Sequence, residues 1–369
     1  MNITFIILPT INEGLSGIKD QMIKKIFSAI FSDKNLSTFP KTSLMKKLDL
    51  LDVGARFGVG YPWNNAKTEN LNVILVEPDP EEVELLTKHH KGDILPYALW
   101  SEETELTLNI NNSPGSSSVL ESNMPFLSQF DDSQRYELKH QIKMSTRTIE
   151  SLHNSGELAD VDFMKMDIQG AEVEVMKGGL NFLKNNLVGL ESEVLFTHLY
   201  HNQPLFSDIE VFIRQELGLE LWDIKKTYWK YSQTSYKNPT KGRLVFGDAL
   251  FLRPLLTLDT WLLGMDIDKA KSKLHMLITV TLAYGYLDYT NSILNAPFID
   301  KYLSKQDKLI FIDHVRKLQK SIYPFKNGLA FLFIPLQMLA NCFKPNHKGW
   351  ATVDSSNHLG SRKKGFFWY

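Results

Sequence analysis

Two acidic residues, Asp52 and Glu77, each end an apolar run, and a glycine-rich turn follows the first of them. Such runs alternate with helix-forming segments, as in a parallel sheet, where the carboxyl ends of the strands meet at one edge. Both carboxylates are therefore expected in one crevice. Glu77 stands where a carboxylate accepts the two hydroxyls of a ribose. The stretch from Leu48 to Pro80 thus predicts a site for a nucleoside cofactor.

The spacing of the glycines indicates which cofactor this site favours. A dinucleotide site prefers the pattern G-x-G-x-x-G, because the pyrophosphate lies on the helix N-terminus. Here the glycines are Gly54, Gly58 and Gly60, and Asp52 precedes the first of them. That carboxylate would repel a pyrophosphate but could hold the ammonium of an amino acid, directly or through water. S-adenosylmethionine is therefore favoured over NAD, and a glycine turn without a ligand is the remaining alternative.

A second group of charged residues lies in the segment DFMKMDIQGAEVEVMKGG, residues 162–179. Met166 ends a predicted strand, so Asp167 is expected at its carboxyl edge, facing the same crevice. Lys165 and Glu172 are expected nearby. Lys165 can equally be a solvated charge, and Glu172 can merely favour a helix N-terminus.

More acids follow on the next predicted strand. Glu191 and Glu193 are two residues apart, so alternation places both on one face of that strand. His198 comes in the adjoining loop, where it is either a base or an ordinary loop histidine. Asp167 with Glu191 or Glu193 could bind a divalent cation through oxygen atoms. Hydrogen bonding or substrate positioning is the commoner role of such clusters, and we assign no metal ligand.

Short apolar runs separated by helical patterns surround these residues. The alternation predicts a doubly wound, mostly parallel α/β sheet. Residues 243–253, RLVFGDALFLR, resemble a late antiparallel strand that closes the sheet. The predicted strands are 48–53, 73–76, 94–99, 105–110, 163–166 and 188–193, and the predicted helices between them are 81–89, 171–185 and 207–217.

A chain of 369 residues is long for one domain, so additional segments are expected. Residues 1–40 form an N-terminal accessory segment with helical spacing from Gly14 to Ser32 and a linker after it. The α/β domain is expected at 41–256, and 257–369 is expected to be a helical C-terminal region without further strands. Within the domain, Asn111 to Ser118 reads NNSPGSSS and predicts a mobile loop.

The composition limits which binding partners and which cellular compartment are expected. The 41 Lys and Arg residues nearly balance the 42 Asp and Glu residues, so no global field favours nucleic acid. Cys342 is the only cysteine, which excludes an intramolecular disulfide and a zinc site of paired thiolates. A reducing cytoplasm fits this usage. The apolar runs of the C-terminal third are shorter than the roughly 20 residues of a membrane-spanning helix.

The motifs together resemble a known family. The segments DVGARFG, VEPDP, YALWSEE, the SSS loop, VDFMKMDIQGAEVEVMKGG and LESEV are similar to those of the FkbM family of S-adenosylmethionine-dependent methyltransferases, over about Leu48 to Arg253. The resemblance implies a seven-stranded class I methyltransferase (Rossmann-like) sheet. It also implies O-methylation of hydroxyls on sugars, glycans or related natural products.

Carried over by position, the resemblance implies roles for single residues. Asp52, Gly54 and Gly58 would line the methionine end of the cofactor, and Glu77 would bind the ribose. Arg56 departs from the family pattern, because many methyltransferases have a glycine there, and it could pair with the methionine carboxylate. The residues expected near the adenine are Gly92, Asp93, Ala98 and Leu99.

Methyl transfer to an alcohol requires the protein to align and deprotonate the acceptor. The sequence offers several candidates for the general base without ranking them. An NAD-dependent sugar-modifying oxidoreductase is an alternative that the glycine spacing disfavours, and a non-catalytic cofactor-binding or scaffolding protein is another. The candidate bases are Asp167, Glu172, Glu191, Glu193 and His198.

The C-terminal third contains the apolar stretch GLAFLFIPLQMLANCF and ends in RKKGFFWY. A packed subdomain is the simpler interpretation of these segments. The alternative is peripheral contact with a membrane or with a glycan-assembly complex, because apolar and basic-aromatic stretches suit interfaces.

Overall fold

The structure is a computed structural model of the chain. It describes residues 40, 42–44, 46–56, 58–66, 69–90, 92–232, 242–322, 330–342 and 350–353. The predicted helix from Gly14 to Ser32 lies outside the described residues, as does nearly all of the linker that follows it.

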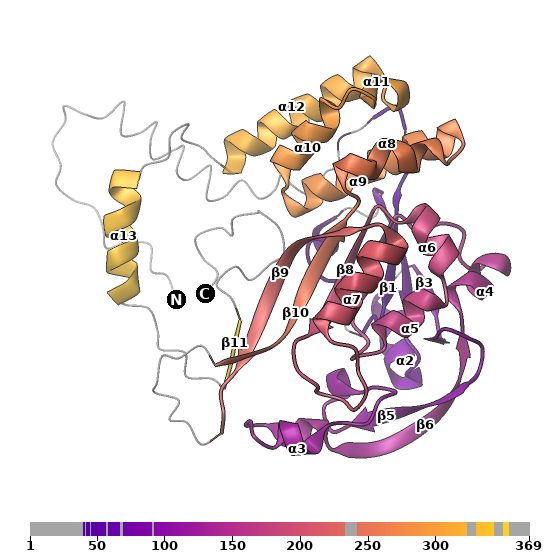
Figure 1. Cartoon of the computed structure of the whole chain (residues 1–369), viewed down its shortest axis with the longest axis vertical. Helices are drawn as coiled ribbons and strands as arrows, with labels where there is room; N and C mark the ends of the chain where they lie inside the picture. The colour runs from indigo at the N-terminus through magenta and orange to yellow at the C-terminus, as the bar shows by residue number, and fades with distance from the viewer. Residues whose placement is uncertain are drawn as a thin grey trace.

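An eight-stranded sheet in the order β11-β9-β10-β8-β7-β1-β2-β3 forms the centre of the molecule (Figure 1). From β8 to β3 all neighbouring strands are parallel, whereas β10 runs antiparallel to both β8 and β9. The predicted seven-stranded doubly wound sheet is confirmed, and β11 adds an eighth strand that the sequence did not predict. The strands are β1 (Leu48–Val53), β2 (Leu71–Val76), β3 (Asp93–Leu95), β7 (Phe163–Met166), β8 (Gly189–Leu195), β9 (Glu220–Trp229), β10 (Arg243–Leu252) and β11 (Ala351–Val353).

A second, three-stranded sheet has the order β4-β6-β5 and is inserted between β3 and β7. The prediction of one strand over 94–99 is wrong, because the chain leaves the large sheet at Pro96, which lacks the N–H that a ladder needs. The third strand, β6, was not predicted; its residues are largely exposed and carry little apolar signal. The strands are β4 (Ala98–Leu99), β5 (Glu105–Asn111) and β6 (Leu138–Arg147).

Four helices cover one face of the large sheet. Their apolar side chains pack on those that β1 and β7 turn to the same side, such as Leu51 and Met164. The prediction of one helix over 171–185 is wrong, because it breaks at Gly178 and Gly179. A Cβ at Gly178 would lie 2.0 Å from the carbonyl oxygen of Trp100, so the backbone approach requires glycine. The helices are α4 (Ile149–Asn154), α5 (Glu172–Lys177), α6 (Leu180–Asn186) and α7 (Phe206–Phe212).

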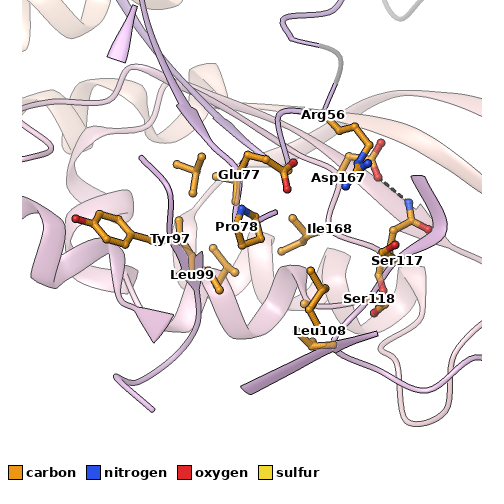
Figure 2. A pocket seen from close by; sticks show the side chains of 18 of the residues that line it. Arg56, Glu77, Pro78, Tyr97, Leu99, Leu108, Ser117, Ser118, Asp167 and Ile168 are labelled. Atoms are coloured by element: carbon orange, nitrogen blue, oxygen red, sulfur yellow. Dashed lines mark hydrogen bonds between the residues drawn. The ribbon is translucent and has the colours of Figure 1, made fainter. Parts of the chain in front are cut away.

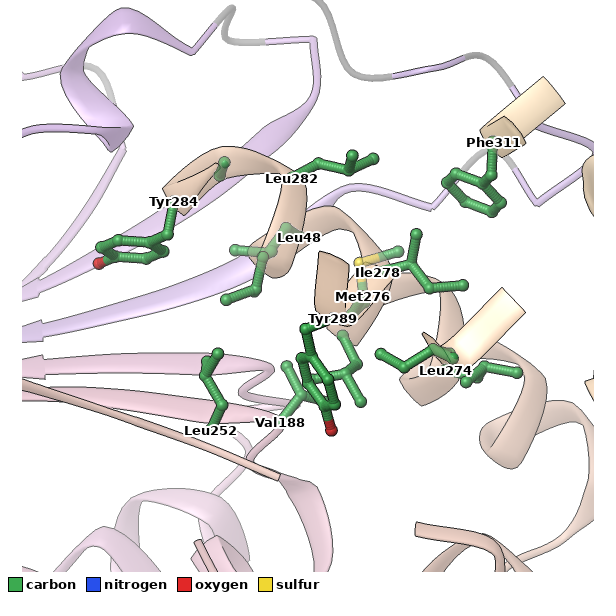
Figure 3. Packing of buried hydrophobic residues seen from close by; sticks show 14 of the residues in the cluster. Leu48, Val188, Leu252, Leu274, Met276, Ile278, Leu282, Tyr284, Tyr289 and Phe311 are labelled. Atoms are coloured by element: carbon green, nitrogen blue, oxygen red, sulfur yellow. The ribbon is translucent and has the colours of Figure 1, made fainter. Parts of the chain in front are cut away.

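The opposite face is covered differently. Between β1 and β2 the described residues contain only the 3-10 turn Trp63–Asn65, so no α-helix from this connection packs there. The C-terminal helices occupy that face and share a core with the strands, in which Leu48, Val188 and Leu252 meet Leu274 and Ile278 (Figure 3). The domain boundary predicted at 256 stays a prediction. The helices on this side are α2 (Pro80–His89), α8 (Leu255–Leu263), α9 (Ile267–Tyr284), α10 (Leu287–Leu294), α11 (Ile299–Tyr302) and α12 (Lys305–Ile322).

Two further elements follow α12. Helix α13 (Ala330–Cys342) stands apart from the rest of the molecule at the left of Figure 1, and β11 then pairs antiparallel with β9. Among the described residues, no helix is both long and apolar enough to cross a membrane.

A buried ion cluster attaches α9 to the sheet. The ammonium of Lys273, which is 0% exposed, lies 2.7 Å from Asp162 Oδ1 and 2.8 Å from Asp160 Oδ1. Lys46 adds a second ammonium within 3.3 Å of Asp49, Asp160 and Asp162. Burial alone would raise the pKa of Asp160, but Lys273 and Lys46 outweigh it and lower the pKa to about 2. The carboxylates of Asp49, Asp160 and Asp162 are close enough to hold a metal ion, but two ammonium groups already lie among them.

We predict that Lys273→Met lowers the free energy of unfolding by about 3 kcal/mol, because it leaves buried carboxylates without their cation. Urea unfolding followed by circular dichroism measures the change. Lys271→Met on the same helix is the matched control. Lys271 is partly exposed, and its ion pair with the exposed Asp268 is long, at 3.6 Å, so this variant should change the free energy of unfolding by less than about 0.5 kcal/mol. Equal stability of the two variants would contradict a structural role for this cluster.

Candidate active site

A cavity opens at the carboxyl ends of β1, β2 and β7, beneath the three-stranded sheet. Figure 2 shows Tyr97 and Leu99 at one end and Asp167 with Ser117 at the other, so the cavity changes from apolar to polar along its length. The apolar lining residues are Val53, Val76, Pro78, Tyr97, Ala98, Leu99, Trp100, Leu108, Pro114, Val119, Met144, Ile168, Ala171 and Val175. The polar and glycine residues are Gly54, Arg56, Glu77, Gly115, Ser117, Ser118, Lys165, Asp167 and Gln169.

Asp52 lies at the end of β1, 0% exposed, and neither of its carboxylate oxygens has a hydrogen-bond partner. Its nearest cation is Lys165 Nζ, at 3.7 Å, on the neighbouring strand β7. Burial raises the pKa of Asp52, and Lys165 opposes this effect. A buried carboxylate without hydrogen bonds is costly, so this group is suited to receiving a donor from a ligand.

Glu77 ends β2 inside the cavity and is 4% exposed. One of its carboxylate oxygens accepts the backbone N–H of Asp79 at 3.0 Å. Burial raises its pKa to about 7, although that N–H and Arg56 favour the ionised form. The ribose-binding role predicted for Glu77 stays a prediction, and its position at the cavity wall is consistent with it.

Arg56 is engaged by helix α2. Its guanidinium lies 2.8 Å from Asp79 Oδ2 and 3.1 Å from Glu82 Oε2. Arg56 therefore ties the glycine turn to the first turn of α2, while still lining the cavity. A contact with the carboxylate of a bound methionine group stays a prediction.

The two glycines of the turn have similar backbones and different surroundings. Gly54 has a φ of +79° and Gly58 a φ of +75°, a region that favours glycine. A Cβ at Gly54 would lie 2.2 Å from the carbonyl oxygen of Asp167, whereas nothing lies within 4 Å of one at Gly58. Gly54 thus lets the ends of β1 and β7 approach each other, and Gly58 leaves open space beside the cavity.

Gln169 joins the two acids at the polar end. Its amide nitrogen donates to Asp167 Oδ1 at 2.8 Å and to Glu193 Oε2 at 2.9 Å, while its amide oxygen accepts the Tyr200 hydroxyl at 2.8 Å. Its φ of +56°, unusual for a residue with a side chain, aims the amide at both carboxylates. Burial raises the pKa of both acids, that of Glu193 well above its usual value. Gln169 bridges the two acids where a cation could otherwise have bridged them.

A C-terminal helix contributes directly to this region. The Tyr284 hydroxyl, at the end of α9, donates to Glu191 Oε2 at 2.6 Å. The sheet register places Glu191 beside Lys165, which in turn lies beside Asp52. Burial and Asp248 raise the pKa of Glu191 to about 7. Charged groups of β1, β7 and β8, joined by the neutral Tyr284 hydroxyl of α9, therefore form one row under the cavity.

The other predicted site residues lie elsewhere. Glu172 is buried but turns back on its own loop, where it accepts the N–H groups of Ile168 and Gly170. His198 is exposed and does not line the cavity. Gly92 and Asp93 are exposed and do not line it either, whereas the neighbouring Ala98 and Leu99 do.

The prediction of a mobile loop at residues 111–118 is wrong. Ser116 and Ser118 are each 1% exposed, and Ser118 Oγ donates to the carbonyl oxygen of Gln169 at 2.7 Å. The Asn111 amide donates to the carbonyl oxygen of Ser116 at 2.6 Å. The small polar residues form an ordered wall of the cavity because their side chains satisfy the backbone groups of the turn.

Sequence reasoning assigned no role to Gln169, Tyr200 or Tyr284. Gln169 stands two positions after Asp167, and that spacing could have suggested that the two side chains point the same way. Tyr284 gives no such signal, because it is 93 positions from Glu191 along the chain.

The comparison with protein-family models agrees with the sequence resemblance. Residues 52–221 match the family model of the methyltransferase FkbM domain. No curated protein matches the chain. A solved FkbM methyltransferase from Methylobacillus flagellatus KT is 12% identical, with 58% of this chain and 47% of that chain covered and a TM-score of 0.31. A SAM-dependent methyltransferase from Agrobacterium tumefaciens is 10% identical, with 64% and 62% covered and a TM-score of 0.30. The chain thus spans less than two thirds of either structure.

We predict that Gly54→Ala destabilises the protein more than Gly58→Ala. Both variants carry the strain of about 1–2 kcal/mol of a side chain at positive φ, but only the first creates a clash, which adds about 1–3 kcal/mol. Thermal unfolding of both variants is monitored by circular dichroism, and the difference between their losses of stability gives the contribution of the clash. Equal losses would show that β1 and β7 do not need this close approach.

Proposed function

We propose that this chain, whose residues 52–221 match the methyltransferase FkbM domain, is an S-adenosylmethionine-dependent O-methyltransferase acting on a sugar or glycan hydroxyl. One observation carries the proposal. The cavity has Glu77 midway along an apolar wall and Asp167 at its polar end, where Gln169 joins Asp167 to Glu193, an acid that does not line the cavity. A nucleoside fits the first part and an acceptor hydroxyl the second.

The residues present fit this cofactor. Tyr97, Leu99 and Leu108 offer apolar surface for an adenine, and Glu77 can accept ribose hydroxyls. Asp52 does not itself line the cavity, but its neighbours Val53 and Lys165 do. Its carboxylate, which has no hydrogen-bond partner, suits the ammonium of the methionine group, received directly or through water. When bound, the sulfonium supplies an electrophilic methyl group.

The side chains must then orient the acceptor and remove its proton. Of the five candidate bases named from the sequence, only Asp167 lines the cavity, so we propose it as the general base. Burial raises its pKa, which brings its basicity closer to that needed near neutral pH. Gln169 fixes one carboxylate oxygen of Asp167 and leaves the other for the acceptor hydroxyl.

Two partly exposed charged residues near the polar end of the cavity, Asp248 and Lys225, support a polyhydroxyl acceptor. Asp248 and Lys225 form an ion pair of 2.9 Å beyond Glu193, and their side chains are 32% and 28% exposed. Such groups offer both acceptors and donors to sugar hydroxyls. The choice of a glycan over another alcohol rests on these two residues and on the family resemblance.

We predict that the protein binds S-adenosylmethionine and not NAD in isothermal titration calorimetry. With the pKa of Glu77 near 7, only about a tenth of this carboxylate is ionised at pH 6, so affinity should be about tenfold weaker at pH 6 than at pH 8. Affinity therefore rises with pH and levels off above the pKa.

Glu77→Gln should bind more weakly and lose this part of the pH dependence. Glu84→Gln is the matched control, because Glu84 is an exposed residue of α2 paired only with Lys88. Binding of NAD alone would favour the oxidoreductase alternative, and Glu77→Gln binding like Glu84→Gln would remove the ribose role.

We predict that Asp167→Asn lowers methyl transfer by a factor of about 10²–10⁴ while S-adenosylmethionine still binds. The assay follows tritiated methyl groups into a glycan extract from cells lacking the gene, and mass spectrometry identifies glycans one methyl group heavier. Glu174→Gln is the control and should retain activity, because Glu174 is a partly exposed acid of α5 that pairs with Lys177 and does not line the cavity. Donor binding without any transfer by the unmodified protein would favour the non-catalytic alternative.

A further inference from the structure

Helix α13 exposes an unusual amount of apolar surface. Six of its large side chains are between 37% and 65% exposed. A typical surface helix has one apolar stripe facing the core and a polar opposite face. These six residues are Leu332, Phe333, Ile334, Leu336, Met338 and Leu339.

The apolar residues surround the helix axis. At 100° per residue, Leu332, Leu336 and Leu339 share one side, Phe333 lies a quarter turn away, and Ile334 and Met338 lie on the opposite side. No charged residue occurs between Ala330 and Cys342. A helix that is apolar all round requires an apolar environment. Its 13 residues span about 20 Å, too little to cross a bilayer of roughly 30 Å.

The charges around this helix all have one sign. Residues 314–353 contain no Asp or Glu, although the whole chain has a net charge of −1. Aromatic residues, which favour the boundary between lipid and water, accompany the cations on both sides. The six cations of this stretch are Arg316, Lys317, Lys320, Lys326, Lys344 and Lys348.

We propose that α13 inserts into the surface of an anionic phospholipid bilayer and holds the protein there. The lipid tails would cover the apolar side chains, and the flanking cations would meet the anionic headgroups. A second copy of the chain is less suited to cover α13, because the cationic segments that flank the helix in each copy would repel each other. This inference does not depend on the methyltransferase proposal.

Vesicle co-sedimentation of the full chain tests the proposal. The chain should bind vesicles of phosphatidylcholine with phosphatidylglycerol more strongly than pure phosphatidylcholine, and less strongly in 0.5 M salt, where charges are screened within about 4 Å. The triple variant Phe333→Gln, Leu336→Gln and Met338→Gln should lower the partition coefficient at least tenfold, because it removes three large apolar side chains from the lipid.

The matched control is Leu256→Gln, Leu263→Gln and Leu309→Gln, three leucines that are 93%, 57% and 65% exposed on α8 and α12. It should bind vesicles like the unmodified chain, and both triple variants should keep the unmodified circular dichroism spectrum. Failure of the unmodified chain to sediment, or equal loss in both triple variants, would overturn the proposal. So would a dimer in solution that only the α13 variant abolishes, since it would show a second copy covering the helix.

Discussion

The buried ammonium of Lys273, held between Asp160 and Asp162, is the interaction on which the arrangement of this molecule depends. It fixes α9 at the edge where β1 and β7 begin. The helix then runs 11 residues, about 16 Å, to Tyr284, whose hydroxyl reaches Glu191 of β8. One helix therefore connects a structural ion cluster to the row of charges beneath the cavity. In this fold the C-terminal region completes the site as well as the core.

Most of the large sheet could be predicted from the sequence, because parallel strands buried on both faces are short apolar runs that end in glycine or acid. β1, β7 and β8 lie close to their predicted positions for this reason. The half-exposed strand β6 and the three-residue β11 could not be predicted, because neither carries an apolar pattern of sufficient length. The break at Gly178 depends on the close approach of the Trp100 backbone, which local propensity does not contain.

The candidate site was predictable to a similar extent and for similar reasons. Asp52, Glu77 and Asp167 were found because each ends a strand, and the topology of a parallel sheet brings strand ends together. What each side chain contacts could not be predicted. Glu172 binds its own loop, Arg56 binds α2, and Tyr284 reaches Glu191 from a helix that has no sequence neighbour in the site. Side-chain partners depend on packing, whereas strand ends depend on topology.

The short strand β11 has a mechanical consequence. It pairs with β9 after the chain has passed through α13, and its neighbour Trp350 packs on Trp229 with 5.0 Å between ring centroids. Helix α13 is therefore anchored to the body at two places, through α12 before it and through β11 after it. A force on α13 is therefore divided between two attachments. A single proteolytic cut before α13 would leave the helix joined to the sheet through β11.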